Sequence, residues 1–273
     1  CLNEFSEPTC VIIKHNNPCG VASAKNIKVS YLKALKADPI STFGGVVLLN
    51  KKIDEELAKL IIDNFYEVIV APKFNKKSIV LEGGAIDVNG KGLLLTTKEC
   101  LLSKIQQRNS FLKAKDYNVI FKKFFGAKKI IWLNKGIAGD DTHGHVDDIA
   151  RFVKTNKVFL AYENNKKDIN FKNLDENFKI LKKVKIGSSQ IKIIKIPMPR
   201  PIYLDKVRVP ASYLNFYIFN KFVLLPTFKD PKDNIVIKIF KKEFNNRKII
   251  PIDCSELIWG FGAIHCLTQQ EPK

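Results

Sequence analysis

The stretch Ala85–Thr96 reads AIDVNGKGLLLT. Asn89-Gly90 supplies the positive backbone φ angles that a tight hairpin turn requires, and the residues on either side suit strands. The stretch therefore predicts a β-hairpin formed by residues 85–88 and 92–96. A helix is expected near residues 118–125 and a strand at 129–133, which completes a ββαβ unit.

The same order of elements returns twice further along the chain. The second unit is predicted to contain strands 149–153 and 158–162, a helix at 174–184 and a strand at 191–196. The third is predicted to contain strands 213–219 and 222–225, a helix at 234–244 and a strand at 248–252. A unit that repeats about every 60 residues indicates a radial or stacked repeat architecture.

The residues before Asn75 show a different pattern. Strands are expected at 10–13, 46–49 and 68–70, with helices at 28–37 and 54–65. The order β-α-β-α-β within about 70 residues predicts a parallel α/β fragment with crossover helices. The whole chain is therefore assigned to the α/β class, with two kinds of segment that meet within Ala71–Gly84.

The composition limits the classes of function. The 273 residues carry a formal net charge of +19, which is compatible with nucleic-acid binding. However, five of the 46 basic residues are Arg, and the lysines are spread along the chain, so we expect a Lys-rich solvated surface and no nucleic-acid partner. No apolar run is long enough to span a membrane, and six scattered cysteines without a CxxC pair indicate reduced thiols and a cytoplasmic location.

Histidine and cysteine mark the candidate chemistry. All four histidines (His15, His143, His145 and His265) fall in loops just after predicted strands, where α/β proteins place reacting groups. Cys266 follows His265 and the glycine-rich WGFG. It is a candidate nucleophile if a neighbour stabilises its thiolate, and otherwise a buried inert thiol.

Two further motifs carry acidic residues. The segment DDTHGHVDD, Asp140–Asp148, places carboxylates beside His145, which suits general acid–base chemistry or binding of a guanidinium group. A zinc or iron site made by His143, His145, carboxylates and Cys266 is the alternative, and a solvated acidic turn is another. In LEGGAID, Glu82 precedes two glycines that allow close approach of a ligand, although an ordinary turn explains them equally.

Five motifs together resemble agmatine deiminase, a guanidine-modifying family of the pentein superfamily. They are LEGGAID, LLTTKECLLS, IIWLNKGIAGDDTHGHVDDIARFV, SYLNFYIFN and GAIHCLTQQ, which occur in this order between residues 79 and 270. The resemblance implies that residues 79–273 form a partial pentein α/β-propeller, with three of the family's five ββαβ modules.

The resemblance also implies roles for residues. Cys266 would be the nucleophile that forms an amidino intermediate, His145 the general acid and base, Asp147 a ligand of the guanidinium group, and Glu82 a residue lining the site. Agmatine would become N-carbamoylputrescine and ammonia, a step of putrescine biosynthesis, without a metal or cofactor. The family's Trp-x-Arg-Asp carboxylate has no counterpart at Trp132 or Trp259, so impaired turnover is expected.

Residues 1–76 resemble a second family, the AICAR transformylase domain of the bifunctional purine biosynthesis enzyme that also carries IMP cyclohydrolase. The motifs are CVIIKHNNPCGVA, DPISTFGGVV and EVIVAPKF. Lys14 and His15 would be the catalytic pair, with 10-formyltetrahydrofolate as co-substrate, and Phe43, Gly44 and Glu67 would contact AICAR. A turn with a surface lysine and histidine explains KHNNPCG equally.

The two resemblances predict a chimeric chain whose parts join near residues 76–79. The expected function is that of agmatine deiminase. Formyl transfer in purine biosynthesis and a non-catalytic basic binding protein are the alternatives.

Overall fold

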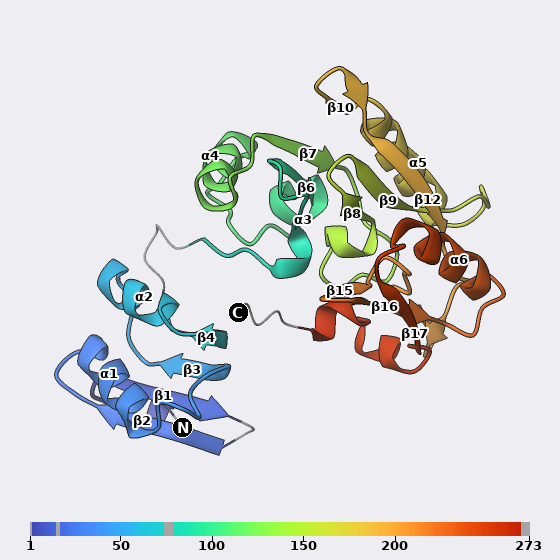
Figure 1. Ribbon diagram of the computed structural model, residues 1–273. Coiled ribbons are helices and arrows are strands. Elements are labelled where there is room, and N and C mark those ends of the chain that lie inside the picture. The colour runs from blue at the N-terminus through green and yellow to red at the C-terminus, as the bar shows by residue number, and fades with distance from the viewer. Residues whose placement is uncertain (1, 15–16, 74–78, 269–273) are drawn as a thin grey trace. The chain divides into compact units, whose positions relative to one another are not determined.

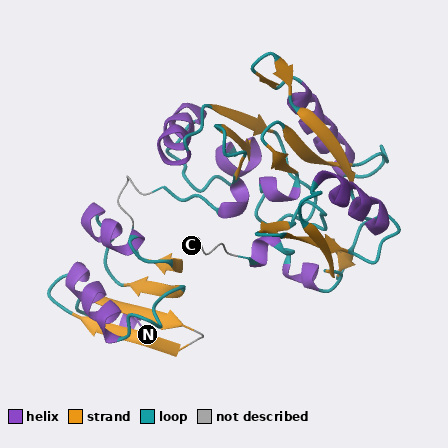
Figure 2. Cartoon of the chain, in the orientation of Figure 1, coloured by secondary structure: helices purple, strands orange, loops and turns teal. Residues whose placement is uncertain are grey.

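The structure is a computed structural model that describes residues 2–14, 17–73 and 79–268, without the side chains of Asn3 and Glu67 (Figure 1). The chain divides into two units, Cys1–Ile79 and Val80–Lys273. Both units mix helices and strands (Figure 2). None of the helices in the described residues is both long and apolar enough to cross a membrane.

The first unit contains one four-stranded sheet in the order β2-β1-β3-β4. Its elements are the 3-10 helix η1 (Leu2–Glu4), β1 (Thr9–Lys14), β2 (Asn17–Ser23), α1 (Ile27–Ala37), β3 (Gly45–Leu49), α2 (Glu55–Ile62) and β4 (Tyr66–Val70). Both helices begin at a side chain that accepts a main-chain N–H: Asn26 accepts from Val29 and Asp54 accepts from Leu57. The core of this unit lies between the helices and the sheet and includes Tyr31, Val47 and Leu57.

The prediction of a parallel β-α-β-α-β fragment is wrong for the first strand. Residues 17–23 form β2, which is antiparallel to β1, although Asn17–Gly20 belong to HNNPCG, where a loop was expected. The crossover through α1 therefore starts from β2 and leads to β3, which is also antiparallel to β1. The pair of β3 and β4 is the parallel pair of this sheet. Pro18 and Gly20 suggested a loop, but Gly20 is needed for packing, since a Cβ there would lie 2.2 Å from the Ala34 carbonyl oxygen of α1.

The second unit contains the three predicted ββαβ units, and the first of them includes the predicted hairpin around Asn89-Gly90. Its elements are the 3-10 helix η2 (Gly83–Ala85), β5 (Asp87–Val88), β6 (Leu93–Thr97), α3 (Lys98–Leu102), α4 (Ala114–Phe125) and β7 (Lys129–Leu133). β5 pairs antiparallel and β7 pairs parallel with β6. Asn89 stabilises the turn, because its Oδ1 atom accepts the N–H groups of Lys91 and Leu93.

The second ββαβ unit repeats this pairing and adds a small hairpin. It consists of the 3-10 helix η3 (Val146–Asp148), β8 (Ala150–Lys154), β9 (Lys157–Tyr162), α5 (Asn170–Lys182), β10 (Lys185–Ile186), β11 (Ser189–Gln190) and β12 (Lys192–Pro197). β9 is the central strand, antiparallel to β8 and parallel to β12. A further hairpin of β13 (Tyr203–Leu204) and β14 (Val207–Arg208) follows.

The third ββαβ unit is the last of the repeat. It consists of β15 (Tyr217–Phe219), β16 (Phe222–Thr227), α6 (Asp233–Glu243) and β17 (Lys248–Asp253), and the 3-10 helices η4 (Leu257–Gly260) and η5 (His265–Leu267) follow it. The predicted strand 213–219 is too long, because residues 213–216 are buried coil and strand pairing begins at Tyr217. Phe159 of β9 contacts Phe240 of α6 with ring centroids 4.8 Å apart, so one core joins the second and third ββαβ units.

Candidate functional site

Three short 3-10 helices carry the predicted deiminase residues. Glu82 immediately precedes η2, His145 immediately precedes η3, and Cys266 lies within η5. Gly84 of η2 lets two of these helices approach closely, because a Cβ there would lie 2.5 Å from His145 Nδ1 and 3.0 Å from Asp147 Oδ2. The second glycine of LEGGAID is therefore required for packing beside the histidine and the aspartate.

The loop before His145 is shaped by Asp140. The Oδ2 atom of Asp140 accepts the main-chain N–H groups of Gly144 at 2.7 Å and His145 at 3.0 Å. Thr97, the N-terminal cap of α3, donates its hydroxyl to the Gly144 carbonyl at 2.6 Å. The acidic residues of DDTHGHVDD thus fold their own loop, and the loop is attached to the first ββαβ unit.

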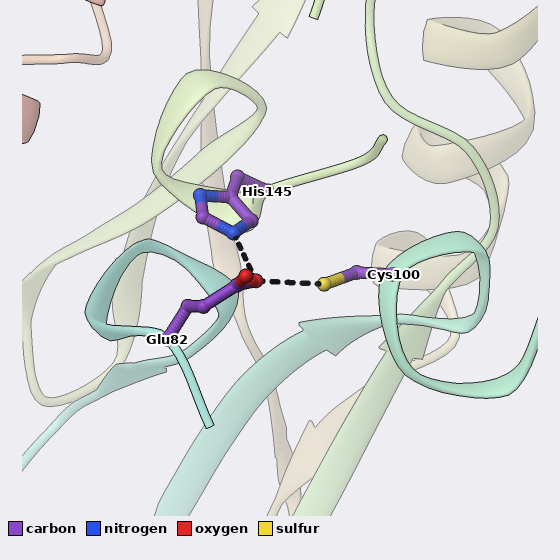
Figure 3. A group of neighbouring side chains, drawn as sticks. All are labelled: Glu82, Cys100 and His145. Carbon is purple, nitrogen blue, oxygen red and sulfur yellow. Dashed lines mark hydrogen bonds and ion pairs between the residues drawn. The ribbon is translucent and has the colours of Figure 1, made fainter. Parts of the chain in front are cut away.

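Glu82 contacts two basic side chains, His145 and Arg108, at one end of the site. Its Oε2 atom lies 2.7 Å from His145 Nε2, and its Oε1 atom accepts a hydrogen bond from Arg108 Nε at 2.8 Å. Arg108 also donates to the carbonyl oxygen of Thr142, so it holds both the carboxylate and the His145 loop. The Cys100 thiol lies 3.9 Å from the same Oε2 atom (Figure 3).

These contacts set the charges of the Glu82 pair. Burial opposes ionisation of Glu82, but the hydrogen bonds and charges of His145 and Arg108 prevail and lower its pKa to about 2. Burial also opposes protonation of His145, yet its contacts with Cys100 and Glu82 and the charge of Asp147 raise its pKa to about 10. His145 is therefore a cation near neutral pH and can donate a proton.

Asp147 and Cys266 form the other end of the site. Asp147 Oδ2 accepts from His265 Nδ1 at 2.7 Å and from Asn215 Nδ2 at 3.2 Å, and it lies 3.8 Å from Cys266 Sγ. Asn215 also holds Cys266, since its Nδ2 atom lies 3.1 Å from Sγ and its Oδ1 atom accepts the Cys266 N–H at 3.3 Å. The Oδ1 atom of Asp147 is buried and has no hydrogen-bond partner among the residues that the structure describes.

The carboxylates of this end affect the thiol. Burial of the sulfur and the negative charges of Asp147 and Asp148 raise the pKa of Cys266 to about 12, although the residue as a whole is exposed. Burial opposes ionisation of Asp147, but the hydrogen bond from His265 prevails and lowers its pKa. Burial and Asp147 raise the pKa of Asp148 well above its usual value. A cation bound beside Asp147 would therefore favour the Cys266 thiolate.

The structure thus gathers Glu82, His145, Asp147 and Cys266 into one linked cluster, and their catalytic roles stay predictions. Neither His143 nor Cys266 belongs to the metal-ligand group found among the described residues, which consists of Glu82, Cys100 and His145. The described residues therefore do not gather His143, His145 and Cys266 into the alternative zinc or iron site.

Sequence reasoning missed Arg108, Asn215 and the role of His265 as a partner of Asp147. Arg108 carried a usable signal, because arginine is rare in this lysine-rich chain. Asn215 lies in the SYLNFYIFN motif but more than 50 residues from Cys266, so only the fold shows their contact.

The first unit brings three predicted residues together. Lys14 Nζ donates to the main-chain oxygens of Phe43 at 2.8 Å and Gly44 at 3.0 Å. His15 and the side chain of Glu67 lie outside the described residues. Lys14 ends β1, whose two neighbours are both antiparallel, so it does not follow a parallel strand as the predicted parallel fragment implied.

Comparison with known proteins gives a consistent result. A family model described as Porphyromonas-type peptidyl-arginine deiminase matches residues 42–272. The agmatine deiminase of Medicago truncatula is 34% identical over 80% of this chain and 64% of its own length. The solved agmatine deiminase of Enterococcus faecalis is 28% identical, with a TM-score of 0.67 over 80% of this chain and 62% of that one. A substrate-bound C. jejuni agmatine deiminase is also 28% identical, with a TM-score of 0.65 over 81% and 66%.

The match is partial. The chain spans 63% of the length of two curated relatives from Legionella pneumophila. The family match begins within the segment that was assigned to a transformylase, and none of these comparisons supports that assignment or a fusion of two enzymes. The mixed α/β fold, by contrast, is shared with solved structures of the deiminases. The chain belongs to the Porphyromonas-type peptidyl-arginine deiminase family.

Proposed function

We propose that this chain carries the site of an agmatine deiminase, which hydrolyses agmatine to N-carbamoylputrescine and ammonia. The observation that carries the proposal is the carboxylate of Asp147, whose Oδ2 atom lies 3.8 Å from Cys266 Sγ and whose buried Oδ1 atom has no hydrogen-bond partner among the described residues. A buried carboxylate oxygen without a partner is costly, and a planar guanidinium group would satisfy it with a charge-assisted hydrogen bond. The relatives named agmatine deiminase support the choice of substrate.

In the first step, Cys266 Sγ attacks the guanidinium carbon. The cation bound at Asp147 offsets the negative charge that raises the thiol pKa, so substrate binding itself favours release of the thiol proton to solvent. His145, protonated near neutral pH, donates a proton to the departing nitrogen, and ammonia leaves as the C–N bond breaks. The product of this step is an amidino group bound to Cys266 through sulfur.

In the second step, water replaces the sulfur. His145, now neutral, takes a proton from the water while the oxygen bonds to the amidino carbon. The C–S bond breaks, the Cys266 thiol is restored, and the carbon leaves as the carbamoyl group of N-carbamoylputrescine. Glu82 stabilises the imidazolium whenever His145 is protonated, and Arg108 keeps Glu82 oriented towards it.

The finer fold assignment belongs to the same proposal. The three ββαβ units would be modules of a pentein α/β-propeller in which the 3-10 helices η2, η3 and η5 face a shared axis. This arrangement is supported by the TM-scores with the solved deiminases. No observation favours formyl transfer by the first unit, because Lys14 already donates to two main-chain oxygens.

The test is ammonia release from agmatine, together with mass spectrometry of the quenched enzyme. We expect an agmatine-derived adduct on the Cys266 peptide and no turnover by Cys266→Ala. Cys254→Ala is the matched control, since Cys254 is a buried cysteine whose main chain bonds to Thr227 and Ile258. Arginine and peptidyl-arginine are compared in the same assay, and citrulline formation in preference to agmatine turnover would contradict the proposed substrate.

A further inference from the structure

One group of side chains near the proposed site has the composition of a metal site. Glu82, Cys100 and His145 come from three separate segments, and their ligand atoms all lie within 4.8 Å of one another. Figure 3 shows the Cys100 thiol and the His145 ring both facing the carboxylate of Glu82. The Glu82 Oε2 atom lies 2.7 Å from His145 Nε2 and 3.9 Å from Cys100 Sγ.

The backbone fixes this grouping. The hydroxyl of Thr97 caps α3 and accepts the N–H of Cys100, and the same hydroxyl donates to the carbonyl of Gly144, the residue before His145. Arg108 donates a hydrogen bond to Glu82 Oε1, and Oε2 faces the other two side chains. The three ligand atoms are therefore held in place by contacts that do not involve a metal ion.

Their chemistry suits zinc. A thiolate, an imidazole nitrogen and a carboxylate oxygen are the ligand types that Zn²⁺ takes, and three protein ligands leave a fourth position for water. Bond lengths of about 2.0–2.3 Å in a tetrahedral site separate ligand atoms by about 3.3–3.8 Å. The gap between Cys100 and Glu82 is already close to that range, whereas His145 must move slightly away from Glu82 and give up their hydrogen bond.

Access and charge also permit binding. Cys100 is fully buried and His145 is 8% exposed, so the two softer ligands lie away from solvent. The Glu82 side chain is 34% exposed and gives an ion a route in from that side. The positive charge of Arg108 opposes a cation, while the nearby carboxylate of Asp147 favours it.

We propose that Glu82, Cys100 and His145 form an inhibitory site for Zn²⁺ or a similar thiophilic divalent ion. The ion would occupy Nε2 of His145, the atom that faces Glu82, so a metal-bound His145 could not transfer protons. Metal binding and deimination would therefore exclude one another. The inhibitory part rests on the proposed function, whereas the binding part does not.

Binding is tested with Co²⁺, which gives a near-ultraviolet thiolate-to-cobalt band when a cysteine coordinates it. We expect this band in the unmodified chain, in Cys254→Ser and in Cys266→Ala, and its displacement by Zn²⁺. Cys100→Ser should lose the band, with circular dichroism confirming that the variant is folded. A band that persists in Cys100→Ser, or that disappears in Cys266→Ala, would overturn the proposal.

Inhibition is tested by titrating Zn²⁺ into the agmatine assay, with each variant normalised to its own activity without metal. The concentration for half-inhibition should rise at least about tenfold in Cys100→Ser and stay unchanged in Cys254→Ser, because one strong ligand is lost. Equal sensitivity of both variants would refute the inhibitory role. If agmatine is not turned over at all, the proposed function fails, and the cobalt spectra still decide whether the site binds metal.

Discussion

Lys14 in the first unit and Asp147 in the second both belong to motifs that suggested catalysis, but their surroundings differ. The Lys14 ammonium donates to two main-chain oxygens and helps to close the loop at Phe43 and Gly44. Asp147 is 1% exposed, and one of its carboxylate oxygens has no hydrogen-bond partner within residues 2–14, 17–73 and 79–268. A polar group that the fold satisfies is explained by structure alone, whereas a buried group left unsatisfied indicates a ligand.

The largest expected effect concerns proton transfer beside Asp147. His145→Asn should lower kcat for agmatine by about 10²–10⁴-fold, because positioned general acid–base catalysis contributes about that much. His143→Asn is the matched control, since His143 lies in the same loop but lines a cavity with Glu99 and Glu176 and not the cluster around Asp147. Equal losses in the two variants would show that the loop, and not proton transfer, is affected.

His145 also predicts a dependence of stability on pH. Its pKa is raised from 6.5 to about 10, so its contribution to the free energy of unfolding is fully present below pH 6.5 and is lost as pH rises through 10. The melting temperature of the unmodified chain should fall between pH 6.5 and 10 by more than that of His145→Asn. Parallel melting curves for the two proteins would contradict the raised pKa.

Removing the charge of Asp147 should have the next largest effect on activity. Asp147→Asn keeps the size of the side chain but removes a charge-assisted contact of about 1.5–3 kcal/mol, so kcat/KM should fall about ten- to a hundredfold. Asp253→Asn, which changes an exposed partner of Lys229, is the control. If Asp147→Asn retains full activity, the unpartnered oxygen does not bind the guanidinium group.

Asp147→Asn, which should lower activity, should raise the reactivity of the Cys266 thiol. With a pKa of about 12, Cys266 should react with neutral iodoacetamide about tenfold faster for each pH unit between 7 and 10. Asp147→Asn should speed this labelling several-fold at pH 8, because one of the charges that oppose the thiolate is gone. Peptide mass spectrometry separates Cys266 from the other cysteines, and slower labelling in the variant would contradict this electrostatic account.

The smallest expected effect lies in the first unit. Lys14→Met removes two hydrogen bonds to main-chain oxygens, and we expect a loss of about 1 kcal/mol from the stability of this unit, with agmatine turnover unchanged. Hydrogen exchange of the β3 amides measures the stability of the first unit. Tryptophan fluorescence does not, because Trp132 and Trp259 both belong to the second unit. A loss of activity in Lys14→Met would remove the contrast between Lys14 and Asp147.

The repeat was readable from the sequence because its signals are local. Asn89-Gly90 determines a turn through backbone conformation, and the strands β7 and β17 each contain a short apolar run that predicts a strand. The strand β2 was missed because Pro18 and Gly20 disfavour strands locally, and the packing of α1 against Gly20 outweighs that preference. Residues 213–216 have strand-like composition, but they form buried coil that positions Asn215.

Local sequence patterns were enough to predict the ββαβ repeat, the hairpin turns and the loops that carry Glu82, His145, Asp147 and Cys266, because each depends on neighbours within a few residues. Which side chains meet in the site depends on the fold. Asn215 contacts both Asp147 and Cys266, and Arg108 contacts Glu82, across separations that no local pattern encodes. The charges of the site follow from those contacts, since burial and neighbouring ions, and not residue type alone, set a pKa.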